Sequence, residues 1–237
     1  MLATIVRSRC LRRVAVVHDQ TKAALAVAAI IVAAIGGVFV SNQLQGGNEP
    51  AAAQVESAIA DGAIVRDDSR ILGEEGSSGV TFVEFLDFEC EACGAAFPIV
   101  EDLREKYAGE VTFVIRYFPL PSHFNSSRAA RAVESAARQG QLEAMYSRMY
   151  ETQAEWGEAG EPKDDLFRSF AEDLGLDMDQ FDADYASQEV EDRVARDVAD
   201  GESLGVSGTP TFYVDGELFQ PETVEDFSAV LDEALAK

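Results

Sequence analysis

The chain has 237 residues and a formal net charge of −24 at pH 7, from 19 basic and 43 acidic side chains. Hydrophobic residues make up 47% of it, which is enough for one substantial core. A surface this acidic repels nucleic acid and anionic lipid headgroups, so we expect no nucleic-acid partner.

The N-terminal segment differs from the rest of the chain in charge and hydropathy. Its basic residues precede an uncharged apolar run over residues 23–40, which is long enough to span a bilayer. Basic residues before such a run place the N-terminus in the cytoplasm and the remainder outside. We therefore predict a cytoplasmic tail over 1–22, a transmembrane signal anchor over 23–40 and a linker over 41–61. A cleaved signal peptide is the alternative.

The three cysteines fall on the two sides of this predicted membrane segment. Cys10 lies in the tail, where it is an incidental residue or, alternatively, a palmitoylation site. Cys90 and Cys93 lie on the oxidising side and are spaced C-x-x-C. In that compartment the spacing indicates either a local disulfide or redox catalysis.

A sheet domain is predicted over residues 62–237. Residues 80–88 are apolar nearly throughout, which predicts a strand buried on both faces. A helix over 90–107 follows and contains Pro98, which should kink it. Residues 111–118 form a second strong strand, and we expect it to run parallel to the first because a helix connects the two.

An Ala-rich helical insertion, expected over residues 124–204, interrupts this sheet. A loop is expected over 153–162, and Pro162 should lie in the first turn of the helix that follows. The expected helices cover residues 126–150 with a break at Gly140, 162–174, 178–186 and 189–204. The chain then returns to the sheet as a hairpin, residues 211–214 and 217–219, closed by a helix over 224–235.

The cysteine pair is predicted to lie where the first strong strand gives way to a helix. The first backbone N–H groups of a helix lack partners within it, and the helix dipole is positive there. Both effects stabilise a thiolate, so Cys90 is the expected reactive, exposed thiol and Cys93 the more buried one. This placement argues against a non-catalytic domain with a merely structural disulfide.

Four features of the chain resemble the thioredoxin-fold disulfide oxidoreductases, in particular the membrane-anchored, bacterial DsbA-like type. They are the segment EFLDFECEAC, Pro98 inside the helix, Gly208–Thr209–Pro210 before the strand TFYVDG, and the helical insertion. The resemblance covers about residues 62–237. It implies an α/β thioredoxin fold with an inserted α-helical subdomain, here preceded by one N-terminal transmembrane helix.

The resemblance also assigns roles to particular residues. Cys90 would exchange disulfides with the substrate, and Cys93 would resolve the mixed disulfide. Thr209 and Pro210 would form a cis-proline loop that faces the cysteines and pairs with an extended substrate. Side chains alternate along a strand, so Glu84 should be buried beneath the cysteines, where a carboxylate with a raised pKa accepts a proton from Cys93.

Glu91 marks a departure from the family, many of whose DsbA-like members carry proline or another neutral residue after the first cysteine. Here Glu91 follows Cys90 directly, with Glu89 and Asp87 close by. Negative charge near the thiol opposes a thiolate, and a less stabilised thiolate makes a less oxidising couple. We therefore expect Glu91 to tune the redox potential below that of a strongly oxidising DsbA.

Two other residues are expected to be structural. His123 should cap a loop, with a substrate or proton-transfer role as the alternative, and Trp156 should pack under the insertion.

The function expected from the sequence is a thiol–disulfide oxidoreductase of the cell membrane with its catalytic domain outside the cytoplasm. It would oxidise reduced or unfolded secreted proteins through Cys90 and Cys93, use no cofactor or metal, and be reset by a membrane redox partner. Isomerase and reductase activities are alternatives within the same chemistry. Copper(I) binding or delivery by the same two thiolates is an alternative of another class.

Overall fold

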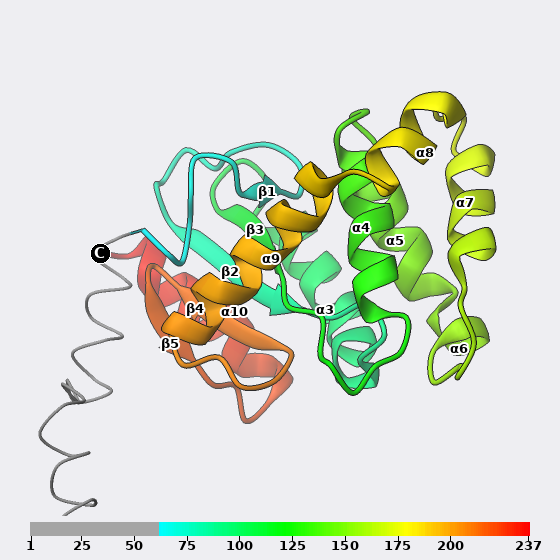
Figure 1. Cartoon of the computed structure of the whole chain (residues 1–237). Helices are drawn as coiled ribbons and strands as arrows, with labels where there is room; N and C mark the ends of the chain where they lie inside the picture. The colour runs from blue at the N-terminus through cyan, green and yellow to red at the C-terminus, as the bar shows by residue number, and fades with distance from the viewer. Residues whose placement is uncertain (1–61) are drawn as a thin grey trace, which may run out of the picture. The chain divides into compact units, whose positions relative to one another are not determined.

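The computed structural model describes residues 62–237, so the predicted tail, membrane segment and linker, with Cys10, lie outside the described residues. Among the helices of the described part, none combines the length and apolar character needed to cross a membrane. A sheet forms one end of this part and a helical insertion lies beside it (Figure 1).

The sheet has five strands within the described residues, in the order β1-β3-β2-β4-β5. The strands are β1 (Arg70–Ile71), β2 (Thr81–Leu86), β3 (Thr112–Tyr117), β4 (Thr211–Val214) and β5 (Glu217–Phe219). The central strands β2 and β3 are parallel, as predicted, whereas β1, β4 and β5 run antiparallel to their neighbours. The β4–β5 turn has positive φ at both Asp215 (52°) and Gly216 (82°), the geometry that matches the twist of a hairpin.

Helix α3 connects β2 to β3, and α10 closes the domain. The helices are α3 (Glu91–Lys106), α4 (Ser126–Ala137), α5 (Leu142–Glu151), α6 (Gln153–Trp156), α7 (Asp164–Asp173), α8 (Met178–Tyr185), α9 (Gln188–Ser203) and α10 (Val224–Leu235). Two predictions are wrong in detail. The segment expected to be a loop at 153–162 contains α6, and Pro162 precedes α7 because Lys163 is the N-cap of that helix.

The two faces of the sheet belong to different cores. Along β2, Phe82 and Leu86 join a core that also holds residues of α3, α10 and the insertion. Val83 and Phe85 join a second core, which includes Leu204 just after α9. Because side chains alternate along a strand, Glu84 lies on the same face as Phe82 and Leu86. That face is the one covered by α3.

A buried group of charges ties the insertion to the sheet. Arg116 on β3 is completely buried, and its guanidinium donates to Asp197 (2.6 Å) and Asp200 (2.5 Å) of α9. It also donates to the carbonyl oxygens of Ala63 (2.6 Å) and Ile64 (2.7 Å). A charge removed from water needs such complete pairing. Arg116 therefore fastens both α9 and the segment that leads into the domain.

Replacing Arg116 with methionine should lower the free energy of unfolding by about 3–5 kcal/mol, because two buried carboxylates lose a partner. Denaturant unfolding at constant pH measures this change. Arg168→Met is the matched control, since it breaks an ion pair with Asp182 in which both side chains are exposed. We expect the control to unfold nearly as the unchanged protein does, and equal losses in the two variants would contradict the importance of burial.

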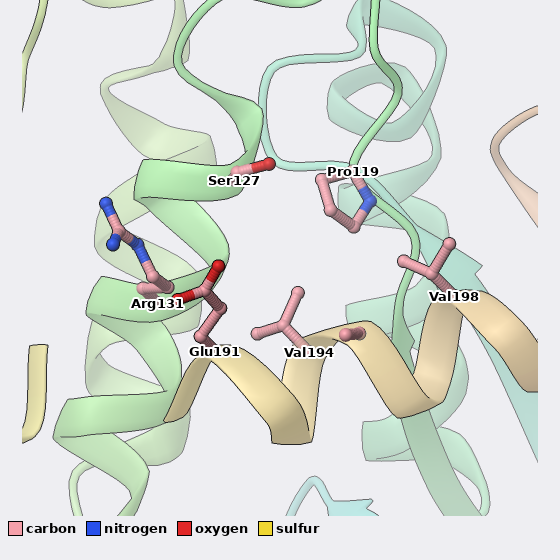
Figure 2. A pocket seen from close by; sticks show the side chains of 7 residues that line it. Pro119, Ser127, Arg131, Glu191, Val194 and Val198 are labelled. Atoms are coloured by element: carbon pink, nitrogen blue, oxygen red, sulfur yellow. The ribbon is translucent and has the colours of Figure 1, made fainter. Parts of the chain in front are cut away.

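A pocket of about 330 Å³ lies between α4, α9 and the chain just after β3 (Figure 2). Pro119, Val194 and Val198 provide its apolar wall. Arg131 also lines it, but its guanidinium carbon lies 4.7 Å from the centre of the Tyr185 ring, so this charge interacts with the ring. The two cysteines do not line this pocket, and it is separate from the site described next.

Candidate active site

The cysteine pair lies at the start of α3, as the sequence predicts. Cys90 is the N-cap residue, and Cys93 follows within the first turn. The N–H of Cys90 donates to the carbonyl of Asp87 (3.2 Å), and the Cys90 carbonyl accepts from the N–H of Gly94 (3.0 Å). Both thiols are free. The short turn after β2 thus places Cys90 at the N-terminus of α3 and Cys93 in the first turn of that helix.

The Thr209–Pro210 loop faces the cysteines. Its peptide bond is cis, as predicted. The Thr209 carbonyl oxygen lies 3.3 Å from Cys90 Sγ and accepts a hydrogen bond from the thiol when Cys90 is protonated. Strand β4 begins directly after Pro210 and pairs with β2, so the sheet itself brings together residues that are far apart in sequence.

Cys90 is less accessible than expected. It retains 7% of its surface, and Cys93 retains none. The predicted order of burial is therefore confirmed, but the prediction of an exposed Cys90 is wrong, because Thr209 contacts the sulfur.

The pKa values of the two thiols move in opposite directions. A hydrogen bond from the Cys93 thiol, with further help from the backbone N–H groups of Ala92 and Cys93, outweighs burial and lowers the pKa of Cys90 to about 5. Burial, and then the hydrogen bond to Cys90 and the charge of Glu84, raise the pKa of Cys93 far above its ordinary value. At pH 7 Cys90 is a thiolate and Cys93 a thiol.

Glu84 is buried on β2, on the face covered by α3. Burial, and then the charge of Cys90, raise the pKa of Glu84 to about 8. The negative charge of Glu84 in turn raises the pKa of Cys93. The predicted burial and raised pKa are thus both present, and Glu84 can hold a proton near neutral pH.

Two tyrosines of α5 pack against the buried side of this site. The rings of Tyr146 and Tyr150 lie 5.5 Å and 5.2 Å from the ring of Phe97 on α3, between centroids. Their hydroxyl groups are buried and have no hydrogen-bond partner among the described residues. Burial raises the pKa of both well above the ordinary value, followed by the charge of Glu84 for Tyr146 and that of Cys93 for Tyr150. Both therefore stay neutral.

Asp87 lies near Cys90 in the sequence, but it is not an unpaired charge. It is buried, and it accepts hydrogen bonds from the N–H groups of Glu89 (2.9 Å) and Leu120 (2.9 Å). It also pairs with His123 Nδ1 at 2.7 Å. Burial raises the pKa of Asp87 in spite of these bonds. Asp87 and His123 together hold the cysteine turn against the loop after β3.

Glu89 is likewise buried, and it ties the same turn to the insertion. Its carboxylate accepts from the N–H of Asn125, the N-cap of α4, at 2.5 Å. The Asn125 side chain donates to the carbonyls of Ala159 and Glu161 in the loop after α6 (both 3.1 Å). Trp156 is completely buried within the insertion, as predicted.

Glu91, by contrast, is exposed in the first turn of α3. Glu91→Gln should lower the pKa of Cys90, because a negative charge near the thiolate is lost. Water screens that charge, so thiol reactivity at about pH 5 should rise by only roughly a third. The ultraviolet absorbance of the thiolate, followed against pH, measures the effect. Glu105→Gln, an exposed acid near the other end of α3, is the control. If the Cys90 pKa does not fall in Glu91→Gln, Glu91 does not tune the redox potential.

Gln153 is the residue that sequence reasoning missed. Its side-chain amide donates to the carbonyls of Phe88 (2.8 Å) and Cys90 (2.9 Å). The contact joins α6 to a turn 63 positions earlier. A polar residue in a predicted loop was the only local signal, and it does not distinguish such a contact from exposure to solvent.

Comparisons with known proteins agree with this geometry. The family described as Thioredoxin matches residues 66–233. A thioredoxin-like oxidoreductase from Silicibacter pomeroyi DSS-3 is 29% identical, with a TM-score of 0.62 over 75% of this chain and 98% of that one. The thiol-disulfide exchange protein alpha-DsbA2 from Wolbachia pipientis is 22% identical, with a TM-score of 0.64 over 78% and 100%. At this identity, the similarity to alpha-DsbA2 concerns the fold alone.

Among curated proteins, similarity is found to segments of longer chains. The Na(+)/H(+) antiporter NhaA 3 of Salinispora tropica is 40% identical over 159 residues, which are 66% of this chain and 23% of the antiporter. The Na(+)/H(+) antiporter NhaA of Herminiimonas arsenicoxydans is 36% identical over 58% of this chain and 21% of its own. The chain therefore spans less than a quarter of the length of these relatives.

Proposed function

Since the chain belongs to the thioredoxin family, we propose that it is a DsbA-like thiol–disulfide oxidoreductase that oxidises folding proteins outside the cytoplasm. The observation that carries this proposal is the contrast between the two thiols. The pKa of Cys90 is about 5, while Cys93 keeps its proton. A stabilised thiolate favours the reduced pair, so the Cys90–Cys93 disulfide readily accepts two electrons.

The oxidase reaction proceeds by two exchanges. A substrate thiolate attacks Cys90 Sγ in the Cys90–Cys93 disulfide, which forms a mixed disulfide and releases Cys93 as a thiolate that takes up a proton. A second substrate thiolate then attacks the substrate sulfur of the mixed disulfide and releases Cys90. The substrate loses two electrons and gains a disulfide, and Cys90, with its low pKa, is the better leaving group.

Glu84 donates a proton to Cys93 or accepts one from it, depending on the direction of the reaction. In the oxidase direction Glu84 donates a proton as Cys93 leaves. During reoxidation Cys90 first forms a mixed disulfide with the partner, and its negative charge disappears. The pKa of Glu84 then falls, because the charge of Cys90 is one of its causes. The carboxylate can accept the proton of Cys93 as that thiol attacks Cys90 Sγ.

Thr209 and Pro210 lie on the substrate side of Cys90. Both residues are partly exposed, and the Thr209 carbonyl oxygen lies 3.3 Å from Cys90 Sγ. An extended substrate can align along this loop before the substrate sulfur reaches Cys90, in the manner of a strand added to a sheet edge. Its backbone can pair with that of Thr209.

The proposed location is the outer side of the cell membrane, with reduced secreted proteins as substrates and a membrane redox partner for reoxidation. The apolar run over residues 23–40 and the basic residues before it support this location. The antiporters that contain a similar segment support a place at a membrane, because antiporters act in membranes.

The test uses the full chain in detergent with its cysteine pair oxidised, mixed with a reduced, unfolded protein that forms disulfides. We expect one substrate disulfide to form per oxidised pair, as measured by thiol counting and mass spectrometry. A substrate with scrambled disulfides tests for isomerase activity. Absence of disulfide transfer would overturn the oxidase proposal, and tight Cu(I) binding by a reduced chain without exchange activity would favour copper delivery.

A further inference from the structure

We infer that Gln153 is a positioning residue for Cys90, through which the helical insertion holds the cysteine turn and keeps its thiol reactive. The inference deepens the proposed function and rests on it only in so far as Cys90 is the exchanging thiol. Three observations support it: the hydrogen bonds that Gln153 makes, the buried contacts of Trp156 on the same helix, and the space left for Gln153 at Gly94.

The hydrogen bonds connect Gln153 to two residues of the turn between β2 and α3. The amide donates to the carbonyl oxygens of Phe88 (2.8 Å) and Cys90 (2.9 Å). The Cys90 carbonyl also accepts the first helical bond from the N–H of Gly94. One side chain therefore bridges the residue at the cap of α3 and the residue two positions before it.

The helix that carries Gln153 is itself firmly held. Trp156, three residues later on α6, is completely buried. Its ring lies 4.9 Å from the ring of Phe167, between centroids, and its Nε1 donates to the carbonyl of Met149 (3.3 Å). Because α6 cannot readily follow the turn, Gln153 holds the turn in place.

Gly94 provides the space for this contact. A Cβ at position 94 would collide with Gln153 Oε1 and lie 3.0 Å from its Cδ. Glycine is unfavourable inside a helix compared with alanine. The absence of a side chain at Gly94 therefore matches the approach of Gln153.

The hydrogen bonds from Gln153 should affect the Cys90 thiol in two ways. The carbonyls of Phe88 and Cys90 carry partial negative charge within the cysteine turn, and the Gln153 amide offsets that charge, which favours the thiolate. The same bonds hold the turn that orients the sulfur toward Thr209 and Cys93. Loss of Gln153 should therefore make the thiolate harder to form.

The experiment measures alkylation of Cys90 by iodoacetamide against pH in the reduced full chain, read by peptide mass spectrometry. Gln153→Leu should slow alkylation at about pH 5 by roughly threefold to tenfold, the range expected when hydrogen bonds near a charge are lost. In alkaline solution, where Cys90 is fully ionised in both proteins, the rates should agree within about twofold. A purely structural role would leave the midpoint of the pH profile unchanged.

Gly94→Ala offers a second route to the same test, because the new methyl group displaces the Gln153 side chain. It should reproduce the altered pH profile although alanine is the better helix former. In the double variant the two effects should not add, as expected for residues in one contact. Additive effects would contradict the proposal that Gly94 acts through its contact with Gln153.

Gln139→Leu is the matched control. Gln139 also bonds backbone from the insertion, donating to the carbonyl of Asp177 (3.1 Å) and accepting from its N–H (2.8 Å). Its loss should not move the pH profile of Cys90. An unchanged profile in Gln153→Leu would overturn the inference even if disulfide transfer by the unchanged protein is observed. A shifted profile would support it even if that transfer is absent.

Discussion

Replacing Cys90 with serine is expected to reduce disulfide transfer to the background rate of the uncatalysed mixture. The thiolate is the reacting species, and among the described residues only Cys90 has a thiol with a pKa below neutrality. Cys93 cannot replace it, because burial keeps that sulfur protonated and out of contact with solvent. Disulfide formation in a reduced, unfolded substrate measures the loss.

Two companion variants make this result specific. With a disulfide-bonded substrate, Cys93→Ser should accumulate a mixed disulfide between Cys90 and the substrate, visible as a single adduct by mass spectrometry. Cys90 attacks the substrate disulfide and releases one substrate thiol, and the resolving thiol is absent. Cys10→Ser should transfer disulfides as the unchanged chain does. Transfer that survives Cys90→Ser, or that fails in Cys10→Ser, would contradict the assignment.

Glu84→Gln is expected to slow the attack of Cys93 on a Cys90 mixed disulfide by about a hundredfold, the lower end of general acid–base effects. The amide fills the same space but cannot take the proton of Cys93. The measurement is the rate at which a preformed mixed disulfide at Cys90 is released by Cys93. Glu134→Gln is the control, because Glu134 is also buried and pairs with Arg70 instead.

The same variant should change how stability depends on pH. Burial raises the pKa of Glu84 from 4.5 to about 8, so the folded protein holds a proton that the unfolded chain releases within this range. The contribution of Glu84 is thus complete below about pH 4.5 and lost as pH rises through 8. It amounts to about 5 kcal/mol by linkage.

Cys90 contributes with the opposite sign, because its folded pKa of about 5 lies below its ordinary value. Its contribution is present at alkaline pH and lost as pH falls through 5. The difference in unfolding free energy between the unchanged chain and Glu84→Gln isolates the glutamate. A difference that does not vary with pH would contradict the raised pKa of Glu84.

The position of the cysteines could be predicted because its causes are local. The apolar run of β2, the two cysteines and the first turn of α3 are contiguous, and they specify a strand, an N-cap and a helix. Thr209 could be placed opposite Cys90 only through the family resemblance. In the structure the pairing of β2 with β4 brings it there.

Burial was harder to predict than position. Asp87 and Glu89 are near Cys90 in sequence, and proximity alone suggested two charges opposing the thiolate. Both are instead buried against the start of the insertion, where backbone N–H groups and His123 pair with them. Leu120, His123 and Asn125 lie more than 30 positions away, so no local pattern indicates these partners.

The contribution of the insertion itself was missed for the same reason. Residues 153–162 contain glycine and little periodicity, which is typical of a loop, yet burial of Trp156 stabilises one turn of helix there. That turn presents Gln153 to the carbonyls of Phe88 and Cys90. Tertiary contacts, rather than helix propensity, decide this segment.

The reduction potential of the Cys90–Cys93 pair tests the central claim most directly. The full chain is equilibrated with glutathione buffers, and the oxidised fraction is read by alkylation and mass. The Cys90 pKa of about 5 lies between those of thioredoxin (about 7) and DsbA (about 3.5). The account therefore predicts a potential between about −270 and −120 mV, nearer the DsbA value. A potential at or below about −270 mV would make the pair a reductant and contradict the proposed oxidase.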